Sequence, residues 1–233
     1  MIGDAITTVY ELAEALPDIE TLRNRCQALA ILDTILSPEW ESRYYSFDSA
    51  WGIGEQMASM RNGSGDEYSI VFSPAGGFIR GFDHESKMSP FANNGELRPG
   101  LLDGLPEVFT PQATERAFSF EGSLCATCCL WRENSDTRWR TGPVDLGGQY
   151  SDGAQLLQIL CDETGAEYRA FAADYYEVDL NQTAIAHVYA GLPLIEHIVG
   201  TLNPDVTLAD IIDELTAIGQ PCGDPERGEG RKS

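Results

Sequence analysis

The chain has little positive charge. Its 233 residues include 15 lysines and arginines against 37 aspartates and glutamates, which gives a formal net charge of −22, and lysine occurs only at Lys87 and Lys232. A surface this acidic repels the phosphates of nucleic acids and the anionic headgroups of membranes. We therefore expect neither as a partner. Long-range electrostatic attraction favours a basic protein partner instead.

The sequence contains no pattern that predicts export or a membrane anchor. Its first residues contain no positively charged run and no unbroken apolar run, so no signal peptide is predicted. No stretch approaches the ~18 uncharged apolar residues of a membrane span. The chain contains 6 cysteines, but a protein of this size folds without disulfides, and we interpret them as reduced thiols. Together these features predict a cytoplasmic protein.

The composition is that of a folded protein. Hydrophobic residues make up 42% of the chain, which is enough to build a core despite the charge. Apolar residues recur at helical spacing near both ends and at every second position in between. Because strands and helices do not alternate, this order predicts an α+β fold. We expect one α+β domain over 1–219, with helices in 1–40, an antiparallel sheet of five or six strands in 42–142, helices in 151–219, and a disordered tail in 220–233.

Local signals predict the boundaries of most elements. The first helix is expected over 4–16 with Asp4 as its N-cap, and the second begins after Asp18 and ends before Pro38. Residues 62–65 predict a hairpin turn because asparagine and glycine accept positive φ. The expected strands are 43–49, 56–61, 67–73, 78–82, 123–132 and 137–141.

The remaining segments are a long excursion and a series of helices. Residues 84–116 are rich in proline, glycine and asparagine, and we expect one short helix near 101–109. Thr207 and Asp210 predict a capping box at the start of the last helix. The earlier C-terminal helices are expected from Ser151 onward, over 165–176, 182–190 and 193–202.

Half of the net charge lies in one segment. Residues 151–219 contain twelve acidic residues and a single cation, Arg169, whereas the charge of residues 51–150 is only −5. This pattern is typical of a solvated acidic face, of a halophilic surface, or of a docking face for a basic protein. The candidate partner-binding residues of this segment are Asp174, Tyr175, Tyr176, Glu177, Asp179, Asp210, Asp213 and Glu214.

Asp83-His84-Glu85 is the cluster whose residue types are best suited to catalysis or ligand binding. A histidine between two carboxylates is suited to act as a general base or a metal ligand. Neighbours on an extended chain do not face one another, so a partner for His84 must come from elsewhere; the alternative is a loop histidine bonded to backbone. The candidate partners are Asp66, Glu67 and Asp48.

Other motifs predict no metal and no cofactor. Cys125-x-x-Cys128-Cys129 is half of a zinc site, but no second pair of ligands exists, and in a strand Cys128 points away from the other two. We therefore interpret these as core cysteines. The run from Trp51 to Glu55 has two glycines but lacks the third glycine of a dinucleotide-binding motif.

Several longer stretches carry a family resemblance. These are YYSFDSAWGIGEQMASMRNGSGDEY, GFIRGFDHESKMSP and DYYEVDL…HVYAGLPL…LNPD. They resemble a widespread group of acidic bacterial proteins of unassigned function, over roughly residues 40–220. The resemblance implies a bacterial cytosolic protein with antiparallel strands followed by helices. Its motifs single out residues expected on one end or face of the sheet: Trp51, Glu55, Met60, Arg61, Asn62, Asp66, Asp83, His84 and Glu85.

The chain is also similar, more loosely, to immunity proteins of polymorphic toxin systems, which are small acidic α+β binders. No contact residues carry over from that group, because its contacts are set pair by pair. Our first hypothesis is a non-enzymatic, acidic protein-binding module of the immunity type that masks a basic partner such as a toxin domain. The alternative is a small enzyme or ligand-binding protein with a site around His84 at the end of the sheet. A structural or regulatory subunit is the third hypothesis.

Overall fold

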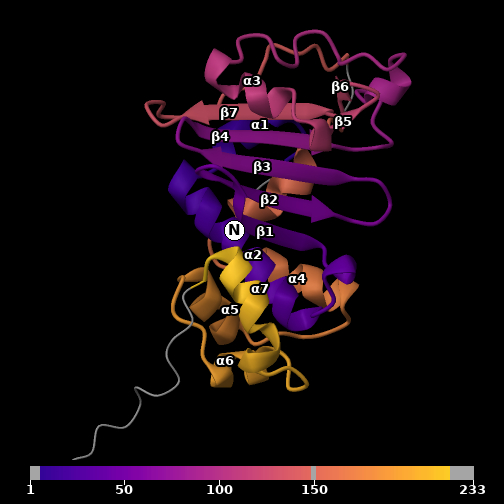
Figure 1. Cartoon of the computed structure of the whole chain (residues 1–233). Coiled ribbons are helices and arrows are strands. Elements are labelled where there is room, and N and C mark those ends of the chain that lie inside the picture. Colours follow the sequence, from indigo (N-terminus) through magenta and orange to yellow (C-terminus); the bar gives the residue numbers. More distant parts are fainter. Residues whose placement is uncertain (1–5, 148–150, 221–233) are drawn as a thin grey trace, which may run out of the picture.

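A five-stranded antiparallel sheet lies at the centre of the computed structural model, which describes residues 6–147 and 151–220 (Figure 1). The strand order is β1-β2-β3-β4-β7, and every neighbouring pair is antiparallel. The predicted α+β class is confirmed, with helices before and after the sheet in sequence. The strands are β1 (Tyr45–Gly52), β2 (Glu55–Arg61), β3 (Glu67–Ser73), β4 (Gly76–Phe82) and β7 (Cys128–Glu133).

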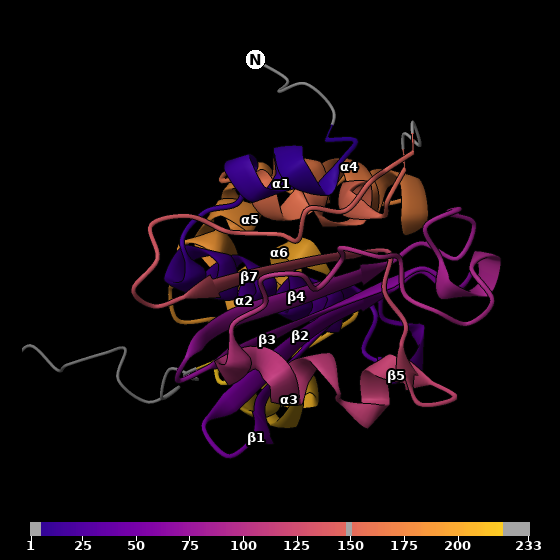
Figure 2. The same ribbon diagram turned by 90° about the horizontal axis from the view of Figure 1, so that it is seen from above.

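Helices cover one face of this sheet, which we call the inner face (Figure 2). Helix α2 (Ile19–Leu36) packs on β1, α1 (Val9–Ala15) packs on β7, and the 3-10 helix η5 (Ala154–Cys161) packs on β3 and β4. Burial of the aliphatic side chains between these layers provides the larger hydrophobic core. Residues 28–35 of α2 are all buried, because further helices cover the side of α2 that faces away from the sheet.

The excursion after β4 lies against the opposite, outer face, and a second core forms there around Phe78, Phe109 and Trp131. Its elements are the 3-10 helices η2 (Pro90–Ala92), η3 (Glu107–Phe109) and η4 (Arg116–Phe118), the helix α3 (Thr110–Ala113), and a two-stranded sheet of β5 (Ser119–Phe120) and β6 (Ser123–Leu124).

The C-terminal helices gather around α2 beside the edge strand β1, in orange to yellow in Figure 1. We call residues 166–218 the helical lobe. No helix within residues 6–147 and 151–220 is both long and apolar enough to cross a bilayer. The lobe consists of α4 (Ala166–Tyr175), α5 (Gln182–Tyr189), α6 (Glu196–Leu202), the 3-10 helix η6 (Leu208–Ile211) and α7 (Ile212–Ile218).

Side-chain caps fix several helix starts. Asp18 accepts a hydrogen bond from the Thr21 backbone N–H, as predicted, and the predicted Thr207/Asp210 capping box is confirmed. The first helix starts later than expected. Its N-cap is Thr8, which forms a capping box with Glu11, whereas the proposed cap Asp4 lies outside the described residues.

Three boundary predictions were wrong. The single strand expected over 123–132 is split, because Cys125 turns away to donate its backbone N–H to Phe118 O, and the chain rejoins the main sheet only at Cys128. Residues 137–141 form one isolated bridge, Trp131 to Arg140, and no strand. The helix expected near 101–109 is displaced to residues 107–113. The predicted tail lies outside the described residues, apart from Gln220.

Candidate functional site

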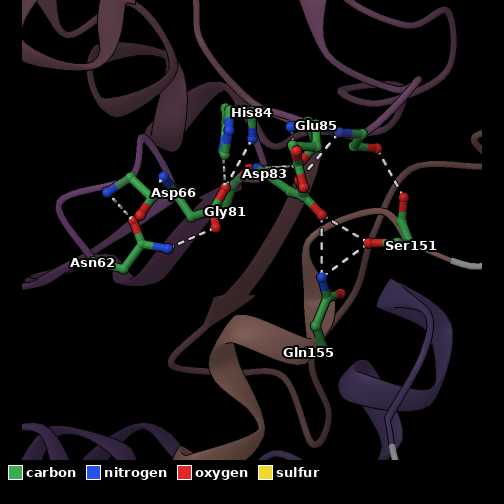
Figure 3. Close-up of polar contacts among 11 residues, drawn as sticks. Asn62, Asp66, Gly81, Asp83, His84, Glu85, Ser151 and Gln155 are labelled. Atoms are coloured by element: carbon green, nitrogen blue, oxygen red, sulfur yellow. Dashed lines mark hydrogen bonds and ion pairs between the residues drawn. The ribbon is translucent and has the colours of Figure 1, made fainter. Parts of the chain in front are cut away.

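A polar cluster lies at the end of the sheet where the β2–β3 turn meets the end of β4 (Figure 3). The turn is closed by Asn62, whose Oδ1 accepts the backbone N–H groups of Ser64 at 2.8 Å and Asp66 at 3.1 Å. Gly63 adopts φ 74° there, a conformation that glycine accepts without strain. The Asn62 amide then donates to Asp66 Oδ2 at 2.7 Å, which fixes the Asp66 carboxylate.

Asp66 is the partner of His84. Its Oδ1 lies 2.7 Å from His84 Nδ1 and also accepts the His84 backbone N–H at 2.9 Å. The hairpin brings the two residues together, because Glu67 lies opposite Phe82, and Asp66 and His84 lie one and two residues beyond that pair. Gly65 lies against the His84 side chain, and a Cβ at position 65 would lie 3.2 Å from His84 Cγ.

The pair is electrostatically matched. The hydrogen bond that His84 donates to Asp66 raises the pKa of His84, whose side chain is 39% exposed. Burial acts to raise the pKa of Asp66, but hydrogen bonds from His84 and Asn62 outweigh it and hold that pKa below its usual value. Both shifts favour an imidazolium–carboxylate pair. Of the three partners proposed from the sequence, Asp66 is thus the one that His84 meets.

Asp83 forms the second half of the cluster and is buried. Its Oδ1 accepts the backbone N–H groups of Glu85 and Ser86 at 3.0 and 3.1 Å. Its Oδ2 accepts the Ser151 hydroxyl at 2.7 Å and the Gln155 amide at 3.1 Å. Asp83 therefore joins the end of β4 to the segment that leads into η5, as Figure 3 shows. Glu85 is exposed and contributes its backbone to the network.

One ring nitrogen of His84 is open to a contact from outside the cluster. His84 Nε2 makes no hydrogen bond to a described residue, so the ring can donate to a ligand there when protonated and act as a general base there when neutral. Ligand atoms of Asp66, Asp83 and His84 lie within 4.8 Å of one another. Both Asp83 oxygens already accept two hydrogen bonds each, and His84 is drawn toward its protonated form. The cluster therefore fits a hydrogen-bonded network better than a metal site.

The other candidates from the sheet region are divided between its two ends. Arg61 lies near the cluster, with its guanidinium 4.6 Å from the centre of the exposed Trp40 ring. Trp51 and Glu55 flank the β1–β2 turn at the opposite end, where Trp51 stacks on Phe118 and Glu55 accepts the Gln112 amide at 2.6 Å. Met60 is buried on the inner face.

The acidic candidates of the lobe differ in their roles. Glu214 binds Arg43 at 2.7 Å, Asp179 binds Arg169 at 2.6 Å, and Asp210 caps η6. The side chains of Asp174, Glu177 and Asp213 are exposed and make no hydrogen bond or ion pair with a described residue.

Tyr175 and Tyr176 belong to an aromatic cluster that covers the beginning of β1. Phe171 lies 4.7 Å from Tyr44 and 5.3 Å from Tyr175 between ring centres, and Tyr175 remains 49% exposed. Tyr176 packs edge-on against both Phe171 and Tyr175. This cluster brings aromatic rings to the acidic part of the surface.

The cysteines occupy packed positions among the described residues. Cys128 points into the inner core and Cys129 into the outer core, as the alternation of a strand requires. Burial raises the pKa of Cys129 to about 12 and that of Cys161 to about 11, which keeps both as thiols. Cys222 lies outside the described residues.

Reasoning from the sequence missed several buried charges, among them Asp33 and Arg80. Asp33 sits in the middle of α2, and Arg80 lies in the outer core and binds Glu67 at 2.5 Å. A charge inside an otherwise apolar run was the available signal for both. Sequence reasoning also missed Gln155, whose surroundings carried no signal.

Comparisons of the chain with protein-family models, with curated protein sequences and with solved structures find no match. The functional interpretation therefore depends on the cluster and on the distribution of charge.

Proposed function

We propose that the protein is a binding module for a basic protein, of the immunity type that masks a toxin domain. The observation that carries this proposal is the charge of the helical lobe. Residues 166–218 contain nine acidic residues and one arginine, and that arginine is already paired with Asp179. Such a surface attracts a basic partner over long distances and repels acidic competitors. The resemblance to acidic bacterial proteins and to immunity proteins belongs to the same proposal.

Charge reversal in the lobe tests it. The triple variant Asp174→Lys, Asp205→Lys, Asp213→Lys changes three exposed residues of the lobe. The control Glu96→Lys, Asp103→Lys, Glu107→Lys makes the same change in net charge within the excursion on the outer face. The tagged proteins are used to capture partners from a bacterial lysate at low and at high salt.

We expect the original chain and the control to retain a basic protein at low salt, and the lobe variant to lose it. High salt should release that protein, because screening weakens exposed charge pairs. Retention of the same partner by the lobe variant, or binding that salt does not change, contradicts the proposal.

A second candidate function is a ligand-binding or general-base site at His84. The 2.7 Å contact with Asp66 supports it, because it orients the imidazole and leaves Nε2 toward solvent. A thermal-shift screen of small molecules tests this function. A ligand that stabilises the original chain should fail to stabilise His84→Ala, whereas equal stabilisation of both would exclude this site.

A further inference from the structure

A groove of about 340 Å³ lies where the beginning of β1 meets η5 and α4. Tyr44 and Phe171 form its aromatic wall, and Gln155, Gln158 and Ile159 of η5 line the other side. Gln155 also donates to Asp83, so the groove adjoins the polar cluster of Figure 3. The groove therefore continues that cluster toward the helical lobe.

The wall of the groove presents aromatic rings in an order that suits a flat cation. Tyr44 lies 4.7 Å from Phe171 and 5.1 Å from Tyr175 between ring centres. Outside the groove lining, Tyr175 stacks on Phe171 at an interplanar angle of 13° and is exposed to solvent. The faces of such rings attract cations, and guanidinium groups stack on them.

The charge around the groove is negative. Glu167 lines the groove, is exposed, and is the one charged residue among the described lining residues. Burial raises the pKa of the Tyr44 hydroxyl, and the negative charges of Asp66 and Asp33 add to that shift. The cation nearest in sequence to Glu167, Arg169, is bound to Asp179 through both Nε and an Nη atom. No arginine among the described lining residues therefore competes with an incoming cation for the Glu167 carboxylate.

We propose that this groove binds an arginine side chain of the basic partner, with the guanidinium against Tyr44 and Phe171 and in contact with the Glu167 carboxylate. This inference rests on the proposed function and names the chemistry that it recognises. Arginine is preferred over lysine, because its planar guanidinium can stack on a ring and bind a carboxylate at the same time. The neighbouring acidic residues of the lobe would attract the partner but would not determine which of its side chains enters the groove.

Hexa-arginine and hexa-lysine peptides serve as probes, and binding to the full chain is followed by NMR. The variants are Glu167→Gln and Phe171→Leu, and Asp205→Asn is the matched control because it removes one exposed charge elsewhere on the lobe. Retained dispersion of the NMR signals shows that each variant is folded. We expect hexa-arginine to shift the signals of Phe171 and Gln155 most strongly. Glu167→Gln and Phe171→Leu should each weaken its binding by about three- to five-fold, whereas Asp205→Asn should have little effect.

Two results would overturn the inference. One is equal weakening by Glu167→Gln and Asp205→Asn, which would mean diffuse attraction by the whole lobe. The other is binding of hexa-lysine as tight as that of hexa-arginine. In both cases the proposed function could still stand, because a basic partner captured from lysate would still depend on the lobe charges. Failure of lysate capture and of both peptides together would instead remove the proposed function itself.

Discussion

The hydroxyl of Tyr168 donates to Asp33 Oδ1 at 2.6 Å and thereby joins α4 to α2 inside the protein. The other carboxylate oxygen of Asp33 accepts the backbone N–H groups of Tyr44 and Tyr45, each at 2.8 Å. One buried carboxylate thus holds the central helix, the first strand and the helical lobe together. It also fixes Tyr44, which forms a wall of the proposed arginine groove.

The first prediction concerns the pH dependence of stability. Burial raises the pKa of Asp33 from 3.8 to about 6, so the folded chain holds this proton to a higher pH than the unfolded chain does. The contribution of Asp33 to the free energy of unfolding is therefore most favourable below about pH 4. It declines by about 3 kcal/mol in all as the pH rises to about 6. We expect Asp33→Asn to lack this decline.

Urea denaturation between pH 4 and 7 measures the difference between the two proteins. Asp33→Ala provides a comparison, because it leaves two buried backbone N–H groups without an acceptor and should lose about 2 kcal/mol or more at every pH. An equally steep decline in the original chain and in Asp33→Asn would show that another group titrates.

The second prediction concerns His84. Its hydrogen bond with Asp66 raises the pKa of the imidazole, so the ring stays protonated to a higher pH than it would alone. NMR titration of the ring signals should show a lower pKa in Asp66→Asn. Glu85→Gln removes an exposed neighbouring charge and should change that pKa less. If Asp66→Asn leaves the titration unchanged, the two side chains are not paired in solution.

The third prediction concerns the buried guanidinium of Arg80. It binds Glu67 and the Cys125 carbonyl oxygen and lies 5.2 Å from the centre of the Phe118 ring. Arg80→Ala should lower the free energy of unfolding by about 3 kcal/mol, because it empties the site and leaves these partners unpaired. Arg138→Ala, at an exposed position, should cost less than about 0.5 kcal/mol. Similar losses for both variants in guanidinium denaturation would contradict the structural role of Arg80.

The fourth prediction compares two glycines that are changed to alanine. A Cβ at Gly142 would overlap the carbonyl oxygen of Gly100, whereas a Cβ at Gly200 in α6 meets nothing within 4 Å. Gly142→Ala should therefore destabilise the fold through steric overlap. Gly200→Ala should raise the free energy of unfolding by about 0.5–1 kcal/mol, because alanine favours the helix. Thermal unfolding of both variants checks these opposite signs.

Local signals in the sequence determined the order of elements and several of their ends. The β2–β3 turn follows from Gly63 and Gly65, which adopt the positive φ that the turn needs, and from Asn62, whose side chain accepts two backbone N–H groups of the turn. The caps at Asp18 and Thr207 follow from short side chains that satisfy nearby backbone N–H groups. These features depend on residues close together in the chain, which is why they could be predicted.

Contacts between distant segments were decided only by the tertiary structure. Local periodicity extended the strand through residues 123–132, but pairing with residues 119–120 draws the chain away from the main sheet. In the same way, the sequence left three carboxylates as partners for His84, and the pairing of β3 with β4 selected Asp66. Asp33 and the groove beside α4 required the packing of three separate elements. Composition placed the negative charge in residues 151–219, and the fold alone brought an aromatic groove next to it, because side-chain packing depends on which segments meet in space.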